Sequence, residues 1–375
     1  MAEIPDVAIV GAGLIGLATA FELAEAGAAV RVYDRSEPAQ AASWAGAGML
    51  APYTENAGDE AMLALCAASL AEYPRFVERV RAASQVDPHL ALDGIVHAAF
   101  GDAHIVRLQR RAVTFAKRGV DCEVLDRTQA LAAEPWLGAR VSGALLVRGE
   151  GRVDNRRLGR ALVAACRARG VRVERVDTLA LECDARRVLG IRTNIGFTPA
   201  DTVVNAAGAW AARVDGVPES SRPAVDPRKG QMLALSAPID FVRHATWLAG
   251  AYVVPRNDGR LLVGATDERD GFDVRVTAEG LRELLDAVLA AAPSLGGFSV
   301  SETWAGLRPG SVDGRPYIGH APLRGLYVAA GHYRNGILLA PITARLLREC
   351  IAGRFPAELA SFGMERCRPN ANEAS

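Results

Sequence analysis

A glycine-rich turn near the N-terminus constrains the fold of this chain more than any other feature. Gly11-Ala12-Gly13-Leu14-Ile15-Gly16 directly follows a buried strand predicted for residues 6–10 and opens a helix predicted for residues 15–26. Alternating residues at 30–33 predict a second strand, which Asp34 closes about twenty residues after the glycines. This order of strand, glycine turn, helix, strand and acid is the βαβ fingerprint of dinucleotide binding.

Each part of the fingerprint has a physical reason. Gly11 makes the tight turn, Gly13 lets a pyrophosphate approach the backbone, and Gly16 allows close contact between helix and strand. The helix N-terminus offers N–H groups and a partial positive charge to the phosphates. Asp34 can accept hydrogen bonds from a ribose diol and repels a 2′-phosphate. The unit alone does not choose between NAD and FAD.

Two segments far along the chain favour FAD. Residues 203–210 predict a buried strand that ends in small residues, and residues 326–332 predict another that breaks at Gly331. Gly336 is then expected to open a last helix that runs to Cys350. A helix N-terminus delivered from this end of the chain would place positive potential near the pyrimidine end of a flavin ring.

The remaining pattern predicts an α/β protein in which a dinucleotide domain is interrupted by a β-rich substrate domain. Asp154 and Thr277 are expected helix N-caps. We expect helices at 60–82, 103–118, 154 onward and 277–291, and strands at 171–174, 188–192, 202–206 and within 231–266.

Composition excludes several classes of function. The 375 residues carry 43 basic and 43 acidic side chains, so no electrostatic footprint for nucleic acid or an anionic membrane is expected. The six cysteines form no C-x-x-C pair, which predicts neither a metal site nor a disulfide framework and fits the cytoplasm. Val7–Leu23 is apolar, but Glu3 and Asp6 precede it and three glycines interrupt it, so neither a signal peptide nor a membrane span is expected.

The chain resembles the D-amino-acid oxidase (DAO) family of FAD-dependent oxidoreductases, and within it the glycine oxidase branch linked to thiamine biosynthesis. Five segments carry the resemblance in family order. They are Ala42-Ser43-Trp44-Ala45-Gly46-Ala47-Gly48-Met49-Leu50-Ala51-Pro52, Lys229-Gly230-Gln231-Met232, Tyr252-Val253-Val254-Pro255-Arg256, Trp304-Ala305-Gly306-Leu307-Arg308-Pro309-Gly310 and Gly331-His332-Tyr333-Arg334-Asn335-Gly336-Ile337-Leu338-Leu339-Ala340-Pro341.

The resemblance implies a Rossmann-like FAD-binding domain of the glutathione-reductase type with a second, sheet-based substrate domain. The FAD-binding domain is then expected at residues 1–85, 145–222 and 305–365. The substrate domain is expected at 86–144 and 223–304, followed by a flexible tail at 366–375.

The resemblance also implies which residues bind non-covalent FAD and which bind substrate. Together with the glycine turn, the expected FAD contacts are Gly11, Gly13, Leu14, Ile15, Gly16, Asp34, Arg35, Ala42, Ser43, Ala47, Gly48, Met49, Thr178, Gly331, His332, Tyr333, Arg334, Asn335, Gly336, Ile337 and Leu338. Arg308, Tyr252 and Arg334 are expected to face the substrate. No side chain is expected to act as a catalytic base, because the flavin performs the hydride transfer.

The substrate residues make chemical sense for an amino acid. Arg308 can clamp a carboxylate with two parallel hydrogen bonds, and Tyr252 can add a hydroxyl donor. Without the resemblance, an arginine before Pro-Gly is more often a solvated turn and a tyrosine in a β run is more often core. Asp267 is a departure, because the best-known glycine oxidases carry an apolar residue near the substrate at this position. It either points to solvent or makes the pocket more polar.

The expected activity is oxidation of glycine, other small amines or D-amino acids to an imine or oxo acid, with reduction of O₂ to H₂O₂. The glycine imine would serve thiazole formation in thiamine biosynthesis. One alternative is a dehydrogenase that passes electrons to another acceptor, and a second is a flavoprotein subunit of an amine-oxidising complex. The expected partners are the small substrate and O₂, with no nucleic acid and no membrane, and we expect a homo-oligomer in the cytoplasm.

Overall fold

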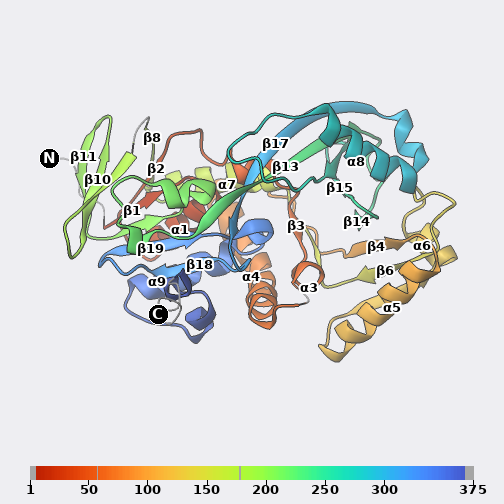
Figure 1. Ribbon diagram of the computed structural model, residues 1–375, viewed down its shortest axis with the longest axis horizontal. Coiled ribbons are helices and arrows are strands. Elements are labelled where there is room, and N and C mark those ends of the chain that lie inside the picture. Colours follow the sequence, from red (N-terminus) through yellow and green to blue (C-terminus); the bar gives the residue numbers. More distant parts are fainter. Residues whose placement is uncertain (1–5, 57, 177–178, 368–375) are drawn as a thin grey trace, which may run out of the picture.

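The computed structural model describes residues 6–56, 58–176 and 179–367. Two large sheets dominate it, one of six strands and one of eight, with helices against both (Figure 1). This is the expected α/β fold with a second, sheet-based unit. The division into domains at particular residues stays a prediction.

The six-stranded sheet has the order β18-β19-β12-β1-β2-β8, and its central strands are parallel. Its strands are β1 (Val7–Val10), β2 (Val30–Asp34), β8 (Arg172–Arg175), β12 (Val203–Asn205), β18 (Tyr317–His320) and β19 (Leu326–Ala330). Three helices, α1 (Leu14–Glu25), α7 (Asn155–Ala168) and α9 (Ala340–Ile351), join α4 (Glu60–Ser84) in one hydrophobic core with β1 and β2. Strands from both ends of the chain therefore flank the glycine turn.

The first βαβ unit packs as the glycine pattern predicts. A Cβ added at Gly16 would lie 1.9 Å from the carbonyl oxygen of Gly11, so only glycine allows this approach of helix to strand. Gly11 has φ +107°, a conformation that other residues rarely adopt. Gly27, at φ +94°, follows the end of α1 as expected.

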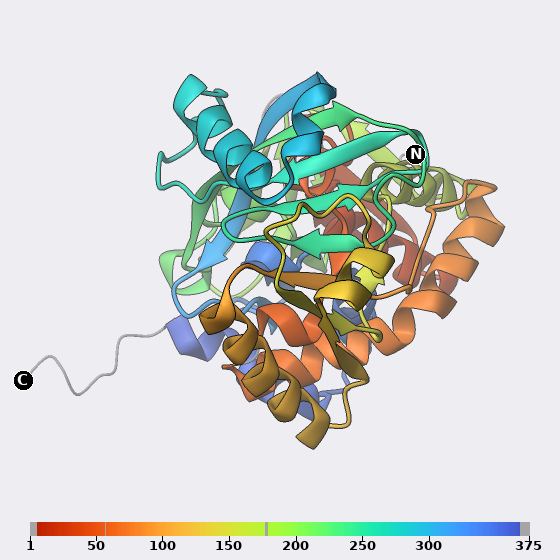
Figure 2. The same cartoon turned by 90° about the vertical axis from the view of Figure 1, so that its right-hand side faces the viewer.

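The eight-stranded sheet has the order β17-β13-β16-β15-β14-β4-β6-β5. Its strands are β4 (Ile95–Ala99), β5 (Cys122–Asp126), β6 (Gly143–Val147), β13 (Val225–Ser236), β14 (Ala245–Trp247), β15 (Tyr252–Pro255), β16 (Arg260–Gly264) and β17 (Ser299–Ser311). Helix α8 (Ala278–Ala291) packs on it through Leu284 and Val288, and α5 (Asp102–Lys117) through Leu108 and Phe115 (Figures 1 and 2).

Smaller elements complete the described fold. A three-stranded sheet contains β9 (Leu179–Cys183), β10 (Val188–Thr193) and β11 (Gly196–Pro199), and β3 (Met49–Leu50) pairs with β7 (Gly151–Arg152). The short helices are α2 (Ala42–Ala45), α3 (Pro52–Glu55) and α6 (Arg127–Ala133). Single 3₁₀ turns include η1 (Gly208–Arg213), η2 (Glu219–Ser221), η3 (Pro293–Gly297), η4 (Tyr333–Asn335), η5 (Ala357–Ser361) and η6 (Met364–Cys367).

The expected helix boundaries hold with one exception. Asp154 caps α7 by accepting from the N–H of Arg157, and Thr277 caps α8 in the same way. The last helix, however, was wrongly predicted to begin at Gly336, because α9 begins at Ala340 after a 3₁₀ turn and a further turn. The strands that were not predicted are β3, β4, β5, β6, β7, β9, β11, β17 and β18.

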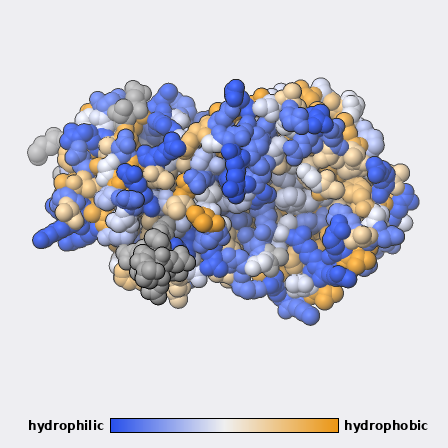
Figure 3. All heavy atoms as spheres, viewed as in Figure 1, coloured by the Kyte–Doolittle hydropathy of each residue, from blue (hydrophilic) through white to orange (hydrophobic). Residues whose placement is uncertain are grey.

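The surface seen in Figure 3 intersperses hydrophilic with hydrophobic residues. Within the described residues, the model contains no helix with both the length and the apolar character needed to cross a membrane. Cys66, Cys166 and Cys350 are buried, and burial raises the pKa of the Cys350 thiol to about 11.

Candidate active site

One cavity, of about 720 Å³, joins the two sheets. Its lining includes the glycine turn and Asp34, which define its nucleotide end, and Tyr252 and Arg308, which define its other end. The first two belong to the six-stranded sheet region, whereas Tyr252 is on β15 and Arg308 is on β17 of the eight-stranded sheet. The site therefore lies where the nucleotide-binding pattern meets the second sheet.

Most of the predicted contact residues line this cavity. They are Gly11, Gly13, Leu14, Ile15, Asp34, Arg35, Ala42, Ser43, Ala47, Gly48, Met49, Tyr252, Arg308, His332, Tyr333, Arg334, Gly336 and Ile337. Gly16, Gly331, Asn335 and Leu338 are not among the lining residues. Thr178 lies outside the described residues.

The nucleotide end of the cavity is held together by Asp34. One of its oxygens accepts from the N–H of Ala12 at 2.7 Å, and the other accepts from the N–H of Ser36 at 2.8 Å. Ser43 Oγ accepts from the N–H of Leu14 at 2.9 Å, which joins the segment at 42–49 to the start of α1. Asp34 therefore shapes the glycine turn as well as lining the cavity.

Buried hydrogen bonds hold the segment at 331–338 in place beside the cavity. Asn335 exchanges side-chain hydrogen bonds with Asn56, at 3.2 and 3.3 Å, and Ser69 donates to the carbonyl of Leu338 at 2.6 Å. His332 Nε2 lies 3.1 Å from Thr343 Oγ1, and burial lowers the pKa of His332 to about 3. The imidazole is therefore neutral at pH 7. By anchoring the backbone, Asn335 and Leu338 position their neighbours Arg334, Gly336 and Ile337, which line the cavity.

Arg308 is positioned by the backbone of neighbouring segments. Its Nη1 donates to the carbonyl of Thr266 at 3.1 Å and to that of Lys229 at 3.4 Å. A Cβ added at Gly230 would lie 2.4 Å from both Nη atoms of Arg308, so the missing side chain makes room for the guanidinium. Burial raises the pKa of the neighbouring Tyr252, which keeps the hydroxyl protonated as a donor.

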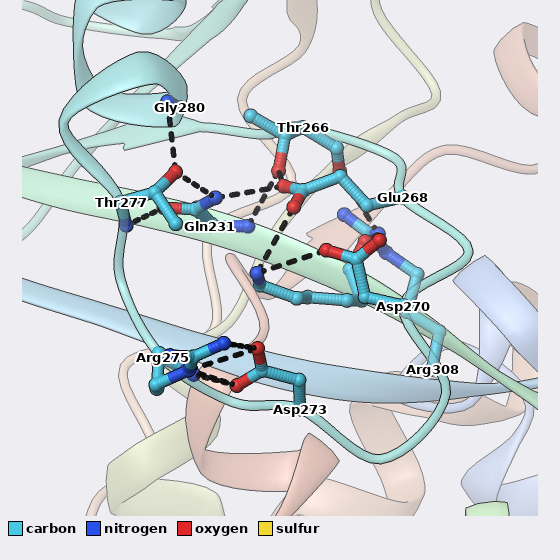
Figure 4. A network of polar contacts seen from close by, with 10 residues as sticks. Gln231, Thr266, Glu268, Asp270, Asp273, Arg275, Thr277, Gly280 and Arg308 are labelled. Atoms are coloured by element: carbon cyan, nitrogen blue, oxygen red, sulfur yellow. Dashed lines mark hydrogen bonds and ion pairs between the residues drawn. The ribbon is translucent and has the colours of Figure 1, made fainter.

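A polar network supports the turn at Thr266, whose backbone carbonyl accepts a hydrogen bond from Arg308 (Figure 4). The Lys229 side chain is fully buried and its Nζ lies 3.0 Å from Glu268 and 3.3 Å from Asp270. Gln231 donates to Glu268 at 2.9 Å and to Thr277 Oγ1 at 3.0 Å. The Lys-Gly-Gln motif therefore ties the loop at 266–277 to β13.

Glu55 is a lining residue that the sequence reasoning missed. It ends α3, and burial raises its pKa to about 7, although the charges of Arg334 and Arg308 act in the opposite direction. The signal available in the sequence was a single acid three residues after Pro52, where the family-like segment at 42–52 ends. A carboxylate and two arginines thus share one end of the cavity.

Glu150 holds the turn that carries Glu55. Its buried carboxylate accepts from the N–H groups of Tyr53 and Thr54, both at 2.8 Å, and from the Thr54 hydroxyl at 2.6 Å. Arg111 also donates to the Thr54 carbonyl. Glu150 therefore acts as a distant N-cap for α3.

Asp267 resolves the alternatives left by the sequence. Its side chain is 25 % exposed and is not among the residues that line the cavity. Its carboxylate accepts from the Tyr333 hydroxyl at 2.6 Å and from Arg334 Nη2 at 3.0 Å. Arg228 Nη2 lies 2.8 Å from the other oxygen. Asp267 therefore contacts the cavity-lining residues Tyr333 and Arg334 from outside the cavity.

Comparison with known proteins gives a consistent family. The model of the family described as FAD dependent oxidoreductase (DAO) matches residues 6–350. The chain belongs to this family. It is 36 % identical to the glycine oxidase of Pseudomonas aeruginosa over 93 % of this chain and 95 % of the relative.

Two further relatives extend the comparison. The crystal structure of glycine oxidase from Geobacillus kaustophilus superimposes with a TM-score of 0.91 at 34 % identity, covering 96 % of this chain and 98 % of that one. The Bifunctional protein ThiO/ThiG of Synechocystis is 36 % identical over 92 % of this chain and 51 % of the relative.

FAD is the cofactor of this FAD-dependent oxidoreductase, and the residues present fit it. Gly11 and Gly13 with the start of α1 would hold the pyrophosphate, because their backbone lines the cavity without side chains. Asp34 and Arg35 would hold the adenosine side, and the segments at 42–49 and 332–337 would enclose the flavin. None of the five cysteines with described side chains lines the cavity.

Proposed function

We propose that this protein is a glycine oxidase-like enzyme. It oxidises glycine and other small primary or secondary amines or D-amino acids to the imine or oxo acid, and it reduces O₂ to H₂O₂. The observation that carries the proposal is Arg308, a cavity-lining guanidinium set beside Tyr252 at the end opposite the glycine turn. Similarity to glycine oxidases over most of the chain supports the substrate class.

The substrate carboxylate binds Arg308, whose planar guanidinium can donate two parallel hydrogen bonds. The backbone carbonyls of Thr266 and Lys229 fix the orientation of this guanidinium before substrate arrives. Tyr252 donates a further hydrogen bond, since its raised pKa keeps the hydroxyl protonated. This positioning supplies much of the rate, because the reacting Cα is held in one orientation. When bound, FAD supplies the two-electron acceptor for the substrate.

Glu55 faces the amine side of the substrate in this proposal. The hydride transfer itself needs no protein base, but an earlier step does. With a pKa near 7, the Glu55 carboxylate can take the proton that a substrate ammonium must lose before the amine is oxidised. The arginines at the same end keep part of the carboxylate ionised at neutral pH.

The glycine imine would serve thiazole formation in thiamine biosynthesis, and the similarity to ThiO/ThiG supports this role. The cytoplasm as location, a homo-oligomeric state and O₂ as acceptor belong to the same proposal.

The test is to mix the purified yellow protein with glycine in air and to measure hydrogen peroxide. We expect peroxide in proportion to the glycine consumed. Glycine-dependent flavin reduction without peroxide would favour the dehydrogenase alternative, and no reduction by glycine, sarcosine or D-alanine would refute the proposal.

A further inference from the structure

Three guanidinium groups lie close together at the substrate end. Arg308 and Arg334 line the cavity, and Arg228 joins Arg334 through the shared carboxylate of Asp267. Burial alone would raise the pKa of Asp267, but hydrogen bonds from Tyr333 and Arg228 and the neighbouring guanidinium charges lower it, so the carboxylate is ionised at pH 7. The guanidinium groups outnumber the carboxylates at this end, as the binding of a substrate carboxylate requires.

Asp267 is the residue that offsets the positive charges of Arg228 and Arg334. One of its oxygens pairs with Arg228, and the other accepts from both Arg334 and Tyr333. A substrate anion that approaches Arg334 must compete with a carboxylate already in place at 3.0 Å. Because Asp267 is only one-quarter exposed, solvent screens this competition weakly.

The position of Asp267 is fixed by the loop that carries it. The next residue, Glu268, pairs with the fully buried Lys229, and Asp270 pairs with the same ammonium (Figure 4). The backbones of Lys229 and Glu268 also exchange hydrogen bonds at 3.0 and 2.9 Å. The backbone at Asp267 is therefore held beside Arg334 by ion pairs to the buried Lys229 ammonium.

We infer that Asp267 restricts the enzyme to amines with one carboxylate by neutralising Arg334 and Arg228, which would otherwise form a second carboxylate subsite. Asp267 is thus a specificity-determining residue that acts through these arginines. Without its charge, the pocket should accept an amino dicarboxylate, with one carboxylate on Arg308 and the other on Arg334 and Arg228. The inference rests on the proposed function for the substrate class.

The test compares two ligands that differ by one carboxylate and cannot be oxidised as amines. Methoxyacetate carries one carboxylate and oxydiacetate carries two, and the ether oxygen replaces the amine in both. Binding to the FAD-loaded protein is measured by the perturbation of flavin absorbance. In Asp267→Asn, the affinity for oxydiacetate relative to methoxyacetate should rise about tenfold or more over the parent, which corresponds to about 1.4 kcal/mol.

The matched control is Asp273→Asn, on the same loop. Asp273 has a nearly equal exposure of 26 %, and its partner Arg275 is 85 % exposed and does not line the cavity. This control should leave the ratio unchanged. FAD content and the unfolding temperature show whether each variant is folded, and Asp267→Ser provides a second way to remove the charge if Asp267→Asn does not fold.

An unchanged ratio in folded Asp267 variants would overturn the inference, and so would an equal rise in Asp273→Asn. A rise specific to Asp267, in an enzyme that does not oxidise glycine, would support the subsite while refuting the proposed function. If neither ligand perturbs the flavin of any variant, the cavity end binds no carboxylates and both ideas fail.

Discussion

At the scale of single residues, the decisive feature is the way that Arg308 is held. Its guanidinium rests on two backbone carbonyls and occupies the space left by a missing side chain at Gly230. An arginine before Pro-Gly is ordinarily solvated, so the sequence alone could not show this environment. The pairing of β13 with β17, in which Arg228 lies opposite Arg308, brings these segments together.

Arg308→Ala should lower kcat/KM for glycine by about 30-fold to several thousand-fold. Loss of one partner of a shielded, hydrogen-bonded charge pair costs about 2–5 kcal/mol, and each 1.4 kcal/mol is roughly tenfold. Arg308→Lys should recover only part of the activity, since an ammonium cannot form the planar fork. Steady-state kinetics with glycine and with an amine that lacks a carboxylate provide the check. A parallel decline for both substrates would make Arg308 structural.

Gly230→Ala should weaken substrate binding while the fold remains intact. The added Cβ would meet the flexible end of Arg308 at 2.4 Å, so the guanidinium moves rather than the backbone. We expect KM for glycine to rise about tenfold, the loss of one charge-assisted hydrogen bond. FAD content and unfolding temperature should remain near those of the parent. An unchanged KM would show that Arg308 does not need this space.

The pH dependence of turnover should report Glu55. Burial raises its pKa from 4.5 to about 7, so the ionised, proton-accepting form is lost as the pH falls through about 7. We therefore expect kcat/KM for glycine to decrease below pH 7, and Glu55→Gln to abolish that limb of the profile. The substrate amine titrates equally in parent and variant, so the comparison isolates the side chain. Identical profiles would exclude Glu55 from proton transfer.

At the scale of elements, the four-residue helix α3 connects the two sheets at the site. Glu150 and Arg111 clamp Thr54 from the side of the eight-stranded sheet, and Asn56 binds Asn335 on the flavin side. Such a short helix has little intrinsic stability, so these tertiary contacts determine its position. The position of Glu55 in the cavity therefore depends on contacts between residues 57 to 279 positions apart.

Glu150→Ala should destabilise the protein and impair turnover together. It leaves the N–H groups of Tyr53 and Thr54 without their acceptor, at a cost of about 1–3 kcal/mol in the free energy of unfolding. Urea unfolding measures the cost, and kinetics should show a higher KM for glycine. Glu123→Ala is the control, because this acid on β5 is 41 % exposed and pairs with a half-exposed arginine, so it should change stability by no more than about 0.5 kcal/mol. Equal effects of both changes would argue against the α3 role.

At the scale of the whole molecule, the two sheets meet along one cavity, which is lined by the glycine turn beside one sheet and by Tyr252 and Arg308 of the other. The glycine turn comes from the first sixteen residues, whereas the substrate arginines come from beyond residue 300. The candidate active site therefore forms only when the fold brings these distant parts of the chain together. Neither sheet alone encloses it.

The flavin should come free when the protein is unfolded. The five cysteines with described side chains do not line the cavity, so we expect packing and hydrogen bonds to hold the cofactor. Acid precipitation should release the yellow colour into the supernatant, with the absorbance of free FAD. Colour retained in the washed precipitate would demonstrate a covalent link.

The sequence by itself determined the features that depend on local spacing. The βαβ unit, the caps at Asp154 and Thr277 and the segments with family-specific motifs could all be read from it, because turn geometry and capping require particular residues at fixed offsets. Helix α4 begins at Glu60 as expected, since its apolar spacing is regular and Asp59 caps it.

Only the tertiary structure decided the contacts between distant residues. Helix α9 begins at Ala340 and not at the predicted Gly336, because buried hydrogen bonds hold the segment before it in turns. The Asn335 side chain donates to Asn56, and the Leu338 carbonyl accepts from Ser69. Glu55 lies in the cavity because tertiary contacts position α3. The Asp267 side chain pairs with Arg228 and Arg334 and does not line the cavity. Such placements depend on which strands pair across the eight-stranded sheet, and local sequence carries no record of that pairing.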